Sequence, residues 1–147
     1  MRPTLLAVAA LLAHASAGHA ELGGLPAEFE SGSTTIVSNV ASASSNYTVR
    51  DTTLPAGTRV REYIAGTGIV FGVAWDGPFL PDLNVLLGKH FDAMAAESAK
   101  APKAGRSRLT VVRPDVVILS GGHMRAFEGR AWVPTELPAG VSTDVVR

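Results

Sequence analysis

Residues 120–134, SGGHMRAFEGRAWVP, look most like a functional site in this sequence. Ser120 and His123 are the residue types of a nucleophile and its general base. Arg125 and Arg130 are suited to binding carboxylates or phosphates. The stretch is therefore either a catalytic or ligand-binding loop, or a turn that leads into a strand.

A Ser–His hydrolase is one hypothesis for this stretch. It needs a carboxylate to orient His123 and a sharp strand-to-helix turn that exposes Ser120. Leu119-Ser120-Gly121-Gly122 lacks the G-x-S-x-G pattern, and a strand rather than a helix is predicted to follow it. We therefore expect Ser120 and His123 to be cross-strand neighbours, and the sequence assigns no catalytic residue.

A metal-dependent enzyme is the alternative catalytic hypothesis, with His123 or His90 acting beside a carboxylate. These are the only histidines after residue 20, and a zinc site uses at least three protein ligands. Asp82, Asp92 or Glu128 would have to complete the site, and no H-E-x-x-H spacing is present. The sequence therefore assigns no metal ligand and no cofactor.

A non-catalytic binding surface is the favoured hypothesis. The candidate binding residues lie on neighbouring predicted strands and are His123, Arg125, Arg61, Tyr63 and Arg130. An arginine-flanked aromatic groove would hold an anionic peptide, a glycan or the edge of a partner protein. In the competing interpretation, Trp75 and Trp132 belong to the core and the arginines lie at its rim.

Three strands are predicted between residues 47 and 75. They cover 47–53, 58–65 and 69–75, with tight turns at Leu54-Pro55-Ala56-Gly57 and Gly66-Thr67-Gly68. In the last of them both faces are apolar, which indicates a central strand covered on both sides. This pattern predicts a three-strand meander.

One amphipathic helix is predicted after the meander, over residues 81–101. Asp82 is a candidate N-cap. The apolar stripe consists of Leu83, Leu86, Leu87, Phe91 and Met94. His90 falls inside this stripe, so we expect a neutral core histidine, with a pocket-facing histidine as the alternative.

The C-terminal half predicts further strands at 109–112, 116–120 and 123–133. Gly121-Gly122 is a two-residue hairpin signal, and Gly129 is a candidate β-bulge. The predicted fold class is α+β: an antiparallel sheet of five or six strands with the helix packed on one face. The single domain is expected over residues 46–134.

The N-terminal segment 1–20 has the pattern of a secretory signal peptide. Arg2 precedes an apolar run over residues 5–13, and small residues precede a cleavage site after Ala20. Residues 21–45 predict a flexible leader with at most a short edge strand at 34–40, and residues 135–147 a polar tail. A periplasmic or secreted location is expected.

Composition narrows the classes of partner. The whole chain has 13 basic and 13 acidic residues. Arg2 is the only charged residue in 1–20, so the chain without this segment has 12 basic and 13 acidic residues. This balance argues against a nucleic-acid binder. No cysteine is present, so the core alone must stabilise an exported fold. The basic run over residues 100–113 is either a solvated loop or a weak patch for anionic polymers.

The motifs REY, VFGVAW, GP–PDL–LLG, SGGHMR and GRAW, in this order, resemble a family of small secreted proteobacterial proteins known as a domain of unknown function. The resemblance covers residues 47–143. It implies a Gram-negative envelope or secreted location, and it carries no activity, cofactor or catalytic residue. Another envelope protein or an anionic envelope polymer is the expected partner; the oligomeric state stays open.

Overall fold

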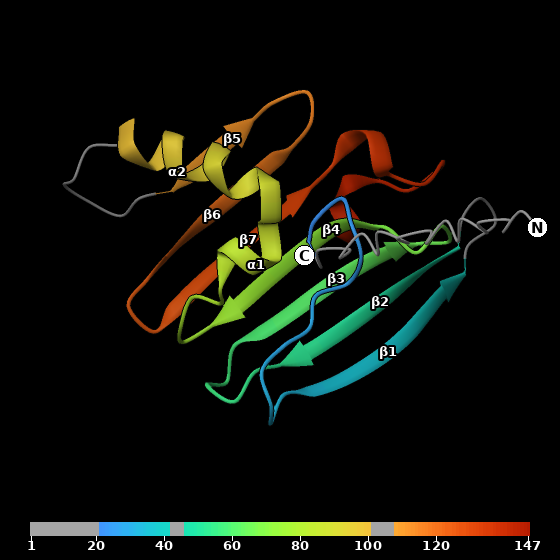
Figure 1. Ribbon diagram of the computed structural model, residues 1–147, viewed down its shortest axis with the longest axis horizontal. Coiled ribbons are helices and arrows are strands. Elements are labelled where there is room, and N and C mark those ends of the chain that lie inside the picture. The colour runs from blue at the N-terminus through green and yellow to red at the C-terminus, as the bar shows by residue number, and fades with distance from the viewer. Residues whose placement is uncertain (1–20, 42–45, 101–107) are drawn as a thin grey trace, which may run out of the picture.

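The structure is a computed structural model in which residues 21–41, 46–100 and 108–147 are described. Its centre is one open antiparallel sheet with the strand order β1-β2-β3-β4-β7-β6-β5 (Figure 1). The strands are β1 (Thr34–Ala41), β2 (Asn46–Thr53), β3 (Arg59–Ala65), β4 (Val70–Gly77), β5 (Leu109–Val112), β6 (Val117–His123) and β7 (Ala126–Trp132).

The helical segment carries the chain from β4 in the middle of the sheet to β5 at its edge. It consists of α1 (Leu83–Leu87), the 3-10 turn η1 (Gly88–His90) and α2 (Phe91–Lys100). Asp82 caps α1, because its Oδ1 accepts hydrogen bonds from the backbone N–H groups of Asn84 and Val85 at 3.0 and 3.2 Å. The predicted helix is therefore present, with a break at Gly88, where φ is +52°.

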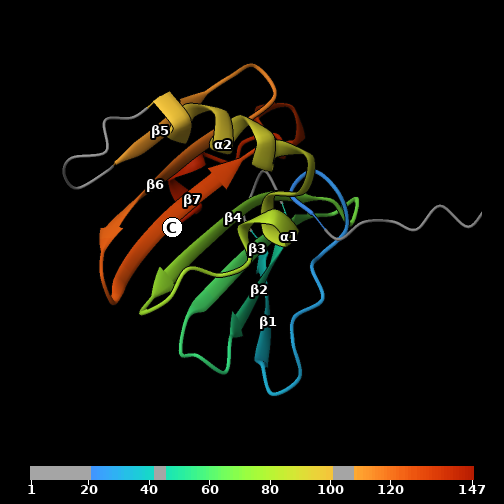
Figure 2. The same cartoon turned by 60° about the vertical axis from the view of Figure 1, so that its left-hand side comes forward.

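One face of the sheet, the helix face, carries the larger core. Leu86 and Leu87 pack with Trp75, Val73 and Ile118 of the sheet, and all are almost fully buried. The N-terminal residues 21–30 cover the same face beside the helix (Figures 1 and 2). Leu22 is buried there, and its backbone N–H donates to the carbonyl of Leu86 at 3.1 Å.

The opposite face is covered in part by the C-terminal residues, including the 3-10 turns η2 (Pro134–Glu136) and η3 (Thr143–Val145). Val146 is fully buried against a smaller core that contains Tyr63 and Phe71. Gly72 makes this contact possible, since a Cβ there would lie 2.7 Å from the Val146 side chain. The C-terminal segment therefore packs directly on the central strands.

The α+β class with an antiparallel sheet is confirmed, but the prediction of five or six strands was too low. Seven strands are present. The first four form one meander, and β5, β6 and β7 form a second. A short edge strand was expected at most over residues 34–40; β1 does lie at the edge of the sheet, and it pairs with β2 along eight positions. Since β1 is mostly exposed, it leaves no burial pattern in the sequence.

The structure also differs from the expected leader and tail. Residues 21–45 were predicted to be a flexible leader, yet Leu22 and Ala27 are buried. Residues 135–147 were predicted to be a polar tail, yet Val146 belongs to a core. In both segments, single apolar residues such as Leu22 and Val146 pack against residues that are distant in sequence. The local composition of each segment therefore gave no sign of this packing.

The hairpin between β6 and β7 is confirmed, but its turn lies further along the chain than predicted. His123 pairs with Ala126, so Met124 and Arg125 form the turn, and Gly121-Gly122 lies within β6. Within this turn, Arg125 has a left-handed backbone conformation with a φ of 66°. The register through Gly129 is unbroken, so the predicted bulge there was wrong; a side chain at Gly129 would collide with the Trp75 ring.

Residues 1–20, 42–45 and 101–107 lie outside the described residues, and with them the predicted signal peptide and the middle of the basic run. In the described part of the chain, no helix has the length and hydropathy needed to cross a membrane.

Candidate functional site

A row of side chains crosses the sheet on the face opposite the helix. Strand pairing places Arg61 opposite Ala74, Ala74 opposite Arg130, and Arg130 opposite Leu119. Directly opposed residues in antiparallel strands point to the same side. Arg61 and Arg130 therefore project from the same face, on either side of the small residue Ala74.

The neighbouring row carries acidic and small residues. Asp76 lies opposite Glu128, and Glu128 lies opposite Gly121. Ala74 and Gly121 leave the middle of the two rows hollow, because neither has a side chain beyond Cβ. The longer residues around them enclose an open groove, and its volume is about 480 Å³.

We call this hollow the arginine groove. Four of the described residues that line it are arginines: Arg61, Arg108, Arg130 and Arg147. Asp76 and Glu128 are its acidic residues, and Thr110, Leu119, Ser120 and Gly121 contribute to the remaining lining. With four positive and two negative side chains, the groove has an excess of positive charge.

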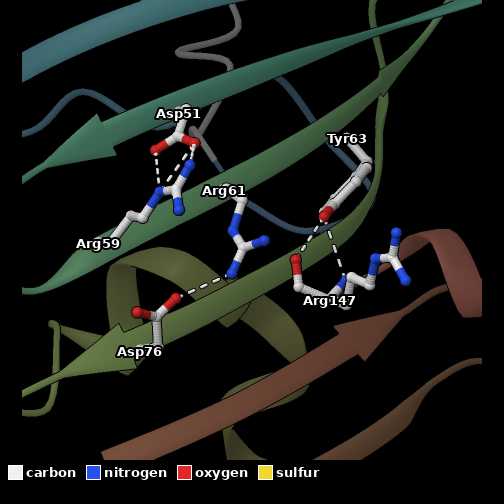
Figure 3. Close-up of polar contacts among 6 residues, drawn as sticks. All are labelled: Asp51, Arg59, Arg61, Tyr63, Asp76 and Arg147. Atoms are coloured by element: carbon white, nitrogen blue, oxygen red, sulfur yellow. Dashed lines mark hydrogen bonds and ion pairs between the residues drawn. The ribbon is translucent and has the colours of Figure 1, made fainter.

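Arg61 is anchored at the β3–β4 side of the groove. Its Nη2 donates to Asp76 Oδ1 at 2.8 Å, and Figure 3 shows this contact between neighbouring strands. Only 23% of the Arg61 side chain is exposed. Its Nε is buried without a hydrogen-bond partner among the described residues, so Arg61 retains an unsatisfied donor.

Arg130 is held in place by two contacts. Its guanidinium carbon lies 5.6 Å from the ring centroid of Trp132, within the range of a cation–π interaction. Its Nη1 donates to the carbonyl oxygen of Val146 at 3.2 Å. These contacts restrain the guanidinium group before any ligand binds, which lowers the entropy cost of binding.

Arg147 reaches the groove because Tyr63 fixes its backbone. The Tyr63 hydroxyl donates to the main-chain oxygen of Arg147 at 2.7 Å and lies 3.1 Å from its N–H (Figure 3). Tyr63 itself is 4% exposed. Its ring is therefore unavailable to a ligand, and Tyr63 supports the groove from the side.

The five candidate binding residues are thus only partly brought together. Arg61 and Arg130 line the groove, and Tyr63 is a buried support. His123 and Arg125 are exposed at the β6–β7 turn and do not line the groove. The His123 ring nitrogen Nδ1 lies 3.2 Å from the carbonyl oxygen of Met124.

Arg147 and Asp76 line the groove without having been candidates, while Arg108 was foreseen only as part of the basic run and Glu128 only as a possible metal ligand. The alternation of strand residues carried a signal for two of them. Asp76 follows Ala74 by two positions, and Glu128 precedes Arg130 by two, so each pair shares a face. No comparable signal marked Arg147, because its position depends on the distant Tyr63.

The two residues of the Ser–His hypothesis do not face each other. Ser120 and His123 are three positions apart on the regular strand β6, so they point to opposite faces. His90 is buried on the helix face, where its Nδ1 is 3.6 Å from Asp115 Oδ2, beyond hydrogen-bond distance. Burial lowers the pKa of His90, so the imidazole is neutral at pH 7.

Comparison with known protein families gives a match along nearly the whole chain. A model described as a protein of unknown function (DUF2844) covers residues 18–146. The chain belongs to the DUF2844 family. Its predicted membership in a family with a domain of unknown function is thereby confirmed.

The match to DUF2844 spans most of the arginine groove. Arg61, Arg108 and Arg130 lie inside the matched residues, and Arg147 follows directly after them. No curated protein and no solved structure matches the chain. The case for a function of this DUF2844 protein therefore rests on the groove itself.

Proposed function

We propose that this DUF2844 protein is an exported, non-catalytic binding module whose arginine groove holds an acidic segment of a partner protein. One observation carries the proposal: four arginines from separate strands and segments line one open groove on the sheet face opposite the helix. Arginine clusters of this kind recognise carboxylates and phosphates through paired N–H donors.

The electrostatics of the groove favour a ligand with separate carboxylates over a densely charged polymer. Asp76 occupies part of the hydrogen-bonding capacity of Arg61, and Glu128 adds a second negative charge. A continuous polyanion would be repelled by both carboxylates. A peptide offers carboxylates to the arginines and backbone N–H groups to Asp76 and Glu128.

The shape of the groove also suits a peptide. It is open to solvent and crosses several strands, from Arg61 on β3 to Thr110 on β5. Small-molecule sites are usually more enclosed, since they bury most of the ligand surface. An extended segment can lie across such a groove while its ends remain in solvent.

The contacts of the residues after Ala20 are compatible with cleavage at this position. The proposed cleavage follows Ala20, and the side chain of Leu22 is fully buried. Glu21 Oε2 accepts a hydrogen bond from the backbone N–H of Lys89 at 3.0 Å. Cleavage after Ala20 would leave Glu21 and Leu22, and with them these two contacts, in the mature chain.

A fluorescence-anisotropy titration tests the binding function, with a labelled peptide in which glutamate alternates with serine as the probe. Arg108→Ala should weaken binding about tenfold, as expected for one lost charged hydrogen bond. Arg113→Ala is the matched control, because Arg113 carries the same charge outside the groove. An equal loss of affinity in both variants would mean that only the net charge of the protein matters, and it would overturn the groove assignment.

A second titration separates the two kinds of partner. An oligogalacturonate of similar length presents carboxylates on a glycan and without peptide N–H groups. We expect the glycan to bind with lower affinity than the peptide. Equal or tighter binding of the glycan would overturn the peptide assignment in favour of an anionic polymer.

Export is tested separately by expressing the full-length chain with its own N-terminus in a Gram-negative host. The purified periplasmic or secreted protein should begin at Glu21 by mass spectrometry. Recovery of the intact N-terminus at Met1 would contradict export by a cleaved signal peptide.

A further inference from the structure

Among the described residues, no strand pairs with the outer edge of β1. Its sequence TTIVSNVA contains no charged residue and no proline, and it pairs with β2 without a bulge. Ile36 and Val37 are 65% and 61% exposed. Proteins usually block such edges with lysine, proline, bulges or short strands, because the free backbone groups pair with other strands.

The opposite edge of the sheet has the protection that β1 lacks. There β5 is only four residues long, against eight in β1. Arg108 and Arg113 flank it directly, so charge repulsion opposes the approach of a second copy. The two edges of one sheet therefore differ in the features that control pairing.

We propose that β1 pairs antiparallel with β1 of a second copy of this chain. Two observations favour a second copy as the occupant. No like charges meet in the β1–β1 pair, because the strand is uncharged. A two-fold pairing also uses the unprotected edge of both copies at once, so assembly ends at a closed dimer.

The expected register is centred on Val37. Antiparallel two-fold pairing places Val37 opposite its own copy, Ile36 opposite Ser38, and Thr35 opposite Asn39. The exposed valines then lie in contact on one face. On the opposite face, Ile36 of each copy lies beside the uncharged Ser38 of the other copy. Ile36 and Val37 therefore both lose solvent contact in the dimer.

This geometry has a consequence for the groove. Antiparallel pairing requires the two-fold axis to be perpendicular to the sheet, which keeps equivalent faces on the same side. The two arginine grooves would then open on one side of a continuous sheet, with both helical segments on the other. The proposed dimer does not depend on the proposed function. Binding of one partner to both grooves would depend on it.

Sedimentation velocity of the full chain tests the dimer over about 1 to about 200 µM protein. The sedimentation coefficient should rise with concentration to that of a dimer. Ile36→Lys should keep the chain monomeric, because it places a lysine near its own copy across the axis. Within one chain that lysine faces Asp51, so folding is preserved, and circular dichroism checks this.

Val112→Lys is the matched control. Val112 is 73% exposed on β5 at the other edge, and its substitution should leave the dimer unchanged. A monomer at every concentration would overturn the proposal. Loss of association in Val112→Lys but not in Ile36→Lys, or growth into larger assemblies, would overturn it as well.

Cross-linking tests the register, since the chain has no cysteine of its own. Opposed residues in antiparallel strands lie within the Cα separation of a disulfide. Under mild oxidation, Val37→Cys should give a covalent dimer, and Val112→Cys should not. Cross-links at position 36 or 38 would support the edge with a shifted register; cross-links only at position 112 would overturn it.

Discussion

The hydroxyl of Tyr63 and the backbone of Arg147 are joined by two hydrogen bonds, of 2.7 and 3.1 Å, across 84 positions of sequence. This contact fixes the C-terminal segment to the sheet at the edge of the arginine groove. Tyr63 was a candidate ligand-binding residue; its contribution is instead to hold a groove residue in position.

Tyr63→Phe should therefore destabilise the C-terminal segment while the core stays intact. Loss of these hydrogen bonds is expected to cost about 1 kcal/mol in the free energy of unfolding. Hydrogen exchange at the Val146 amide should therefore speed up. Tyr47→Phe is the control, since Tyr47 belongs to the same aromatic cluster and makes no contact with Arg147; equal effects of both variants would refute this role.

Glu62 should make the protein less stable as the pH rises. It is 1% exposed, and burial raises its pKa above the ordinary value of 4.5, against the opposing effects of the Ala27 N–H and Arg50. Between pH 4.5 and the raised pKa of the folded state, the folded protein therefore binds more protons than the unfolded protein. The unfolding free energy of the wild type, relative to Glu62→Gln, should fall as the pH rises through this range.

Urea unfolding between about pH 4 and pH 8 measures this difference. Glu97→Gln is a contrasting control, because Lys100 lowers the pKa of Glu97. The stability of the wild type relative to that variant should rise with pH. A Glu62→Gln difference that stays constant or rises would refute the assignment.

His90 should destabilise the protein on acidification. Burial lowers its pKa below the ordinary value of 6.5, assisted by Lys89 and opposed by Asp115 and Glu21. Its stabilising contribution is complete above pH 6.5 and is lost as the pH falls toward the folded-state pKa. The unfolding free energy of the wild type relative to His90→Gln should fall over this range, and a flat profile would contradict a neutral core histidine.

Gly129→Ala should destabilise the fold by overpacking. A Cβ at this position would overlap the ring of Trp75, which is 1% exposed and cannot move aside. The expected loss is about 1 to 3 kcal/mol. Gly66→Ala is the control, because a Cβ at Gly66 meets no atom within 4 Å. Thermal unfolding compares the two, and an equally stable Gly129→Ala would refute the packing argument.

Much of the fold was predictable because its signals are local. The alternation over residues 58–65, the apolar strand at 69–75 and the Asp82 cap all correspond to observed elements. The central position of β4 followed from its two apolar faces. Each of these inferences needed only neighbouring residues.

The features that sequence reasoning missed depend on distant partners or on backbone pairing. β1 is stabilised mainly by hydrogen bonds to β2, so its exposed side chains show no burial pattern. Gly121-Gly122 resembled a turn, yet the hairpin closes at Met124-Arg125. Of the groove arginines, only Arg61 and Arg130 were predicted to lie together, because Arg108 and Arg147 come from separate parts of the chain.

Chemical-shift mapping by ¹⁵N NMR shows directly whether the arginine groove binds an acidic peptide. The isotope-labelled protein is titrated with the same glutamate–serine peptide. If the groove binds the peptide, saturable shifts should be concentrated at the amides of Ala74, Gly121 and Arg130. Shifts concentrated at the exposed turn residues His123 and Arg125, or no saturable shifts, would contradict it.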